Sequence, residues 1–175
     1  ALGILVENNA PFRVVVARNY FHPQLAAINT DALTHGRAWM LLRPFGRKQW
    51  IGPLFVPGQT ACWSCLTYSL HVNGWTHEAA AAAGLPTTSA VTQAMAATEA
   101  AKWLLTGSNA ELEGQIRAID TARLNIETHY ILQRPQCPDC GNRTTKKSVV
   151  VSDRLISRVS GIVAEMTRLP NYGPL

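Results

Sequence analysis

The chain has 175 residues, a formal net charge of +5, 47% hydrophobic residues and 15% charged residues. This composition excludes a disordered chain and is typical of one globular domain that is large enough to bury its own core. No apolar run approaches the roughly 20 residues that cross a bilayer, and no basic stripe is interleaved with aromatic residues, so we expect no membrane and no nucleic-acid partner.

The first predicted elements are a strand, a helix and a second strand. Residues 12–17 (FRVVVA) and 38–44 (AWMLLRP) are mostly apolar runs, which predict strands that are buried on both faces. The residues between them carry helix signals in the expected order. These signals are Pro23, Leu25, Ile28, Ala32 and Gly36. Short connections between the three elements predict a βαβ crossover with parallel strands and a helix on the sheet face.

The middle of the chain has a different character. In residues 45–60 (FGRKQWIGPLFVPGQT), turn residues bracket two short apolar runs, which predicts a β-hairpin. Residues 67–86 leave two alternatives open, a short helix or a loop, because alanine favours a helix without specifying its packing.

A second clear helix is predicted at about residues 89–105, with a small-residue face that would lie close to a helix or a sheet. This predicted face consists of Ala94, Ala97, Ala101 and Leu104. Residues 122–132 (ARLNIETHYIL) then alternate between apolar and polar side chains. The alternation predicts a half-exposed strand that is antiparallel or lies at an edge of the sheet.

The four cysteines form two C-x₂-C pairs, Cys62 with Cys65 and Cys137 with Cys140. Two such pairs indicate a zinc site, because four thiolates complete a tetrahedral shell around Zn²⁺. Gly141 suits a metal knuckle, and we expect it to adopt a positive φ. A closed shell leaves no open coordination position, so the zinc should be structural. It should also clamp the helix at about 89–105.

Several other interpretations of the cysteines compete with zinc. A thioredoxin-like redox pair needs only one C-x₂-C, at the start of a helix that follows a strand; here a predicted hairpin precedes the first pair. Unrelated core thiols would require chance pairing at two places. An iron–sulfur cluster stays open because thiolates also suit iron, as does replacement of one cysteine by His71. Four cysteines are too few for a disulfide scaffold.

The order of these elements resembles the C-terminal half of the ThiF-like fold, over about residues 10–141. The motifs that carry the resemblance are CWSC, a helix that ends in EAAKWLLTG, two strands and CPDCG. ThiF-like proteins are adenylating enzymes related to ubiquitin activators. The resemblance implies a Rossmann-related α/β fold with a Cys₄ structural zinc site, often in a homodimer. The metal ligands would be Cys62, Cys65, Cys137 and Cys140.

The chain departs from the adenylating members at two points. It has no G-x-G-x-x-G turn, although the half of the fold that carries this turn can precede the chain, which begins at Ala1 and which we expect to be an excerpt or a processed product. Adenylating members also place a D-x-x-D-N segment after the strand that corresponds to residues 12–16. Here residues 16–20 are VARNY, which lack the oxygen ligands that Mg²⁺ prefers. Adenylyl transfer at this position is therefore not expected.

Residues 50–66 (WIGPLFVPGQTACWSCL) resemble the ThiF-like domain of azoline-forming cyclodehydratases, the heterocyclases that make thiazole/oxazole-modified microcins and related bacteriocins. The resemblance implies a cytoplasmic, non-catalytic scaffold that binds the leader region of a precursor peptide. ATP and Mg²⁺ would be used only by an adjoining YcaO-type domain or protein. We expect residues 1–141 to form the ThiF-like domain and residues 142–175 to be a linker and the start of the YcaO-type domain.

Two alternative functions are kept. One is an adenylyltransferase that acts on the C-terminus of a carrier protein or a peptide. The other is a structural zinc module that mediates dimerisation, with some of the five tryptophans as interface anchors. No catalytic or cofactor-binding residue is assigned. Ordinary surface or turn positions are expected for Asp120, Glu127, His129 and Asp153.

Overall fold

The computed structural model describes residues 12–75 and 84–141, so the predicted linker and domain start at 142–175 and Asp153 lie outside the described residues. The elements follow in the order β1 (Phe12–Val16), α1 (Gln24–His35), β2 (Ala38–Arg43), β3 (Lys48–Phe55), α2 (Trp63–Val72), α3 (Pro86–Thr106), β4 (Gln115–Asp120) and β5 (Asn125–Tyr130).

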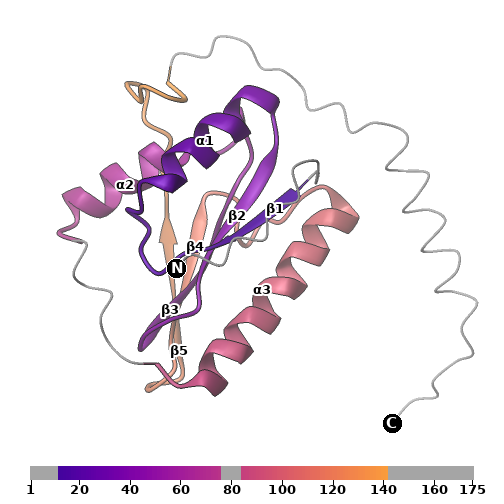
Figure 1. The fold of residues 1–175 in the computed structure, drawn as a ribbon, viewed down its shortest axis with the longest axis vertical. Coiled ribbons are helices and arrows are strands. Elements are labelled where there is room, and N and C mark those ends of the chain that lie inside the picture. Colours follow the sequence, from indigo (N-terminus) through magenta and orange to yellow (C-terminus); the bar gives the residue numbers. More distant parts are fainter. Residues whose placement is uncertain (1–11, 76–83, 142–175) are drawn as a thin grey trace, which may run out of the picture.

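The five strands form one sheet in the order β1-β2-β3-β4-β5. β1 is parallel to β2, which confirms the predicted βαβ crossover, and the remaining neighbours are antiparallel. Helices α1 and α2 cover one face of the sheet and α3 covers the other (Figure 1). The result is an α/β domain, as the sequence predicts, and the structure shows that it has three layers.

Strand β2 lies between β1 and β3, and its position accounts for the apolar run from Ala38 to Leu42. Every residue of β2 is buried. Trp39 and Leu41 join the core beneath α1 and α2, whereas Met40 and Leu42 join the core beneath α3. A strand that is covered on both faces has no position for an alternating polar residue.

The predicted hairpin within residues 45–60 is wrong. A single strand, β3, runs through this segment and pairs with β2. The turn-forming Gly52 lies inside β3 at a φ of +84°, where the pairing with β2 is irregular. A Cβ at Gly52 would lie 2.6 Å from the carbonyl oxygen of Gln115. This glycine therefore permits a bulged strand and a close backbone approach instead of a turn.

Residues 67–86 were predicted to be a short helix or a loop, and their first part is the end of helix α2 (Trp63–Val72). Helix α2 begins directly after Cys62 and buries Cys65, Leu66 and Leu70. These positions recur at helical spacing, so a helix that begins at Trp63 was predictable from the sequence. Residues 76–83 lie outside the described residues.

Helix α3 is longer than predicted, and its predicted packing face is wrong. The residues that it buries are Thr92, Ala96 and Ala100, whereas the predicted face at Ala94, Ala97, Ala101 and Leu104 is exposed. The Thr92 hydroxyl donates to the side-chain oxygen of Gln49, which is fully buried in β3. This polar pair lies on the stripe of the alanine-rich helix that packs against the sheet, together with Ala96 and Ala100.

The strand at the end of the described sheet matches its prediction. β5 pairs antiparallel with β4 on one side, and the sheet order gives it no neighbour on the other. Its side chains are half-buried or exposed throughout. Asp120, at the end of β4, accepts hydrogen bonds from the backbone N–H groups of Ala122 and Arg123 and so occupies the expected turn. It is buried rather than exposed.

Candidate metal centre

The fold brings together the four cysteines that the sequence singles out. Cys62 precedes the first residue of α2 and Cys65 lies in its first turn, whereas Cys137 and Cys140 lie in the loop after β5. All four are buried, and their Sγ atoms lie within 4.8 Å of one another. The Sγ–Sγ distance is 3.5 Å both between Cys62 and Cys137 and between Cys65 and Cys140.

These distances fit a single metal ion. Zn–S bonds of about 2.3 Å in a tetrahedron separate neighbouring sulfurs by about 3.8 Å. The four thiols are free, and 3.5 Å is far longer than the roughly 2.05 Å of a disulfide bond. The donor set consists only of sulfur, which suits zinc or iron–sulfur chemistry and not Mg²⁺ or Ca²⁺. The four cysteines can therefore hold a thiophilic metal ion in a closed shell.

Backbone hydrogen bonds shape both cysteine pairs. The N–H of Cys65 donates to the carbonyl of Cys62, and the N–H of Gly141 donates to that of Cys137 at 2.8 Å. The N–H of Arg134 points at the sulfur of Cys65, with an N–Sγ distance of 3.4 Å. Such donors to sulfur stabilise a thiolate and orient it toward a metal.

Gly141 is required for a different reason than the sequence suggested. Its φ does not lie in the left-handed region, so the expected positive φ is wrong. A Cβ at this position would instead lie 2.3 Å from the carbonyl oxygen of Pro135 and 2.5 Å from that of Cys137. The loop closes so tightly around Cys137 that only a residue without a side chain fits.

The thiols differ in how readily they lose a proton. Burial raises the pKa of Cys62 and raises that of Cys65 to about 11. Burial also acts to raise the pKa of Cys137, but the backbone N–H groups of Cys140 and Asp139 donate to its sulfur and lower it to about 7. Metal binding at neutral pH must therefore release protons from Cys62 and Cys65.

A polar bridge beside the sulfurs ties the two cysteine pairs to α1. Asp139 accepts a hydrogen bond from the hydroxyl of Ser64 and another, at 2.9 Å, from the amide nitrogen of Asn29. The amide oxygen of Asn29 in turn accepts from the backbone N–H of Trp63 at 3.1 Å. Asn29 is only 1% exposed. The middle residues of both C-x₂-C motifs thus contact each other directly.

Asp139→Ala is expected to lower the free energy of unfolding by about 1–3 kcal/mol, because the buried amide of Asn29 loses its acceptor. Urea denaturation at saturating zinc measures the change. Glu111→Ala is the matched control: it removes a carboxylate that is 66% exposed and paired with Arg117, and it should cost at most about 1 kcal/mol. Equal costs for the two variants would contradict the proposed importance of the bridge.

The structure bears on two of the alternatives for the cysteines, a redox pair and replacement of one cysteine by His71. CWSC does open a helix that follows a strand, so the sequence argument against a redox pair was wrong on this point. The sulfurs of this pair nevertheless contact those of the second pair, as a shared metal requires. His71 is exposed in the last turn of α2 and does not join the four thiols.

The expected clamp on the second predicted helix is also wrong. Helix α3 packs on the opposite face of the sheet from the four cysteines. The cysteines instead join the start of α2 to the loop after β5 and pack in the core beneath α1 and α2. A metal here would fasten one helical layer to the end of the sheet.

The position after β1 carries other contacts in place of the missing carboxylates. The guanidinium of Arg18 lies 4.6 Å from the centre of the Phe45 ring. The side-chain oxygen of Asn19 accepts a hydrogen bond from the backbone N–H of Phe21. These residues stabilise the loop before α1 and offer no cluster of carboxylate oxygens for Mg²⁺.

The fold is shared with solved heterocyclases. A heterocyclase solved in complex with substrate and cofactor is 34% identical to this chain, with a TM-score of 0.67 over 78% of this chain and 21% of its own. The heterocyclase TruD is also 34% identical, with a TM-score of 0.65 and coverages of 78% and 23%. This chain is a ThiF-like domain of the heterocyclase type. The ThiF-like domain spans less than a quarter of either heterocyclase.

A protein with lower sequence identity has a similar fold. E. coli MccB, solved with MccA, is 21% identical with a TM-score of 0.58, covering 75% of this chain and 39% of MccB. No protein-family model matches the sequence, and no curated protein matches it significantly. Within residues 12–75 and 84–141, no helix is long and apolar enough to cross a membrane.

Proposed function

We propose that this ThiF-like domain is the zinc-stapled scaffold of an ATP-dependent cyclodehydratase. Such an enzyme forms thiazoline and oxazoline rings from Cys, Ser and Thr residues of a ribosomally made precursor peptide. The observation that carries the proposal is the 34% identity to two heterocyclases over 78% of this chain. The buried set of four thiols supports it.

The four cysteines would hold one Zn²⁺ as a structural cross-link. Cys62, Cys65, Cys137 and Cys140 supply four sulfurs, which fill a tetrahedral shell and leave no position for a substrate. The ion would fix the start of α2 against the loop after β5. We prefer zinc to an iron–sulfur cluster because the S–S distances suit one tetrahedral ion and two knuckles of this spacing commonly bind zinc.

The chemical contribution of the domain would be positioning. Holding a precursor peptide near an active site raises the effective concentration of its reacting side chains. ATP and Mg²⁺ would be used in an adjoining YcaO-type domain or protein, and residues 142–175 would form the linker and the start of such a domain. Self-association is a further part of the proposal. Two of the five tryptophans, Trp39 and Trp50, are buried and cannot be interface anchors, whereas Trp63, Trp75 and Trp103 are half-buried.

The proposal is tested by incubating the full-length protein with its precursor peptide and ATP, followed by mass spectrometry. The expected result is the loss of one water for each ring formed, and no loss when ATP is left out. Failure to lose water, with or without partner proteins, would rule the proposal out. Pyrophosphate exchange that depends on this ThiF-like domain alone would instead support the alternative adenylyltransferase.

A further inference from the structure

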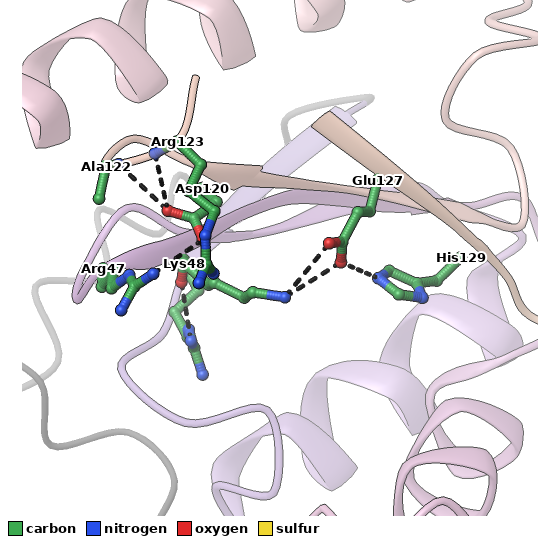
Figure 2. Close-up of polar contacts among 8 residues, drawn as sticks. Arg47, Lys48, Asp120, Ala122, Arg123, Glu127 and His129 are labelled. Carbon is green, nitrogen blue, oxygen red and sulfur yellow. Dashed lines mark hydrogen bonds and ion pairs between the residues drawn. The ribbon is translucent and has the colours of Figure 1, made fainter. Parts of the chain in front are cut away.

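The charged side chains along β3, β4 and β5 are satisfied by one another (Figure 2). Glu127 is paired with Lys48 at 3.1 Å. Asp120 is paired with Arg47 and Arg123, each at 3.4 Å. The four thiols form a different kind of cluster, because they are free and buried and their sulfurs lie against one another. Facing thiols have a second chemistry besides metal binding, which is oxidation to disulfides.

The contacts between the sulfurs cross from one C-x₂-C motif to the other. Cys62 faces Cys137 at an Sγ–Sγ distance of 3.5 Å, and Cys65 faces Cys140 at the same distance. Both sulfur–sulfur hydrogen bonds of the described residues therefore run between the motifs. Each facing pair needs to close by only about 1.5 Å to reach the bond length of a disulfide.

The separation of the facing cysteines along the chain also favours disulfides between the motifs. The two members of each facing pair are 75 residues apart. A cross-link over so many residues removes more conformational freedom from the unfolded chain than a cross-link that closes a single C-x₂-C motif. Disulfides between the facing pairs therefore stabilise the folded state more than disulfides within the motifs.

A small oxidant can approach the thiols at two places. Cys137 is 4% exposed, but it lies in a loop between Gln136 and Pro138, which are both exposed. Cys62 lines a cavity of about 10 Å³, together with neighbours that include Thr60. A cavity of this volume has room for one molecule of about the size of water. Hydrogen peroxide is close to this size, so the cluster is within reach of a peroxide although its sulfurs are buried.

We propose that a peroxide converts the facing pairs, Cys62 with Cys137 and Cys65 with Cys140, into two disulfides that replace the metal as the cross-link of the domain. The disulfides join the start of α2 to the loop after β5, as a bound ion would. The domain therefore keeps its fold when oxidation releases the ion. A dithiol reductant reverses the reaction by thiol–disulfide exchange.

The chemistry is the same in both facing pairs. One sulfur attacks an oxygen of hydrogen peroxide, the O–O bond breaks, and a water molecule leaves a sulfenic acid on that sulfur. The facing sulfur then attacks the sulfenic sulfur, so that the S–S bond forms, the S–O bond breaks and a second water molecule leaves. Each disulfide consumes one peroxide, which is reduced to two water molecules. The two protons come from the thiols or, where a metal has displaced them, from solvent.

The test is treatment of the zinc-loaded 175-residue chain with excess hydrogen peroxide, followed by digestion without reductant and mass spectrometry. Peptides that join Cys62 to Cys137 and Cys65 to Cys140 should be at least about ten-fold more abundant than peptides linked within a motif. A coloured zinc indicator should report release of the ion as these disulfides form. The near-ultraviolet circular dichroism of the oxidised, zinc-free chain should match that of the reduced, zinc-loaded chain.

The matched control is the same oxidation of the same chain in concentrated urea. Disulfides within the motifs should predominate there, because the shortest loops close most readily in an unfolded chain. A dithiol reductant and a zinc chelator, added together to the oxidised folded chain, should remove its near-ultraviolet signal. Neither measurement requires a substitution, so the result does not depend on whether a cysteine variant folds.

Four results would overturn the proposal. The folded chain could pair its cysteines within the motifs, its thiols could reach sulfinic acid without forming disulfides, its thiols could keep the ion and fail to react, or the oxidised chain could unfold as the ion leaves. None of these results bears on the cyclodehydratase function, which is measured separately as loss of water from a precursor peptide.

Discussion

Cys62→Ser is expected to remove the bound metal and most of the free energy of unfolding together. Structural zinc sites contribute about 10–16 kcal/mol of apparent binding free energy, which is as large as the roughly 5–15 kcal/mol that holds a whole domain folded. Cys62 is 3% exposed, and its sulfur lies 3.5 Å from that of Cys137. Metal analysis and urea denaturation on the same preparations measure both losses.

The control for this experiment is the parent chain treated with a strong zinc chelator, which should reproduce the instability of Cys62→Ser. Thr67→Ser, a mild change in the same helix at a half-buried position, should keep one equivalent of metal and its stability. If Cys62→Ser remains folded with a full equivalent of zinc, the four cysteines do not form the proposed staple.

Gly141→Ala is expected to lower the free energy of unfolding by about 3 kcal/mol or more and to weaken metal binding. The added Cβ would lie 2.3 Å from the carbonyl oxygen of Pro135 and 2.8 Å from the nitrogen of Cys137. Both are backbone atoms of the loop that carries Cys137, so they cannot move away without displacing its sulfur. Competition with a coloured zinc chelator measures the affinity, and denaturation measures the stability.

Gly36→Ala is the matched control for Gly141→Ala. Gly36 ends α1 at a φ of +66°, and a Cβ there would meet no atom within 4 Å. The cost should be only about 1–2 kcal/mol from the left-handed backbone, with zinc affinity unchanged. A Gly141→Ala variant that binds zinc as tightly as Gly36→Ala would show that the loop is less tightly packed than the structure indicates.

The sequence predicts the βαβ unit because several independent signals agree there. The continuous apolar run of β2 requires cover on both faces, and Gly36 terminates α1 in the left-handed conformation that such a residue favours. Local propensity and tertiary packing favour the same structure at these positions. The prediction fails at Gly52, where turn-like residues serve a bulge inside a strand.

The packing face of α3 could not be predicted from residue types alone. An alanine-rich helix presents small residues on several sides, so its hydrophobic pattern does not choose among them. The face that packs on the sheet makes contacts that are distant along the chain, such as the hydrogen bond between Thr92 and Gln49, which lie 43 residues apart. Sequence patterns reflect residues that are close along the chain, so they do not reveal a contact between residues that are far apart in the sequence.

The ligands of the metal site were predictable from the sequence, but the hydrogen bonds around them were not. The spacing of Cys62, Cys65, Cys137 and Cys140 carries the chemistry by itself. The bridge from Asn29 to Asp139 spans 110 residues, and only the folded chain brings these side chains together. The half-exposed, antiparallel character of β5 was predictable from its alternating sequence.

The separation of the two cysteine pairs along the chain has a consequence for biosynthesis. The sulfurs of Cys62 and Cys137 meet across 75 residues, and closing so long a loop costs roughly 4 kcal/mol of chain entropy. The two thiols within one C-x₂-C motif face no such barrier. In a newly made chain that is short of metal, oxidation within each motif therefore competes with assembly of the site. The ion must be available before the thiols are exposed to an oxidant.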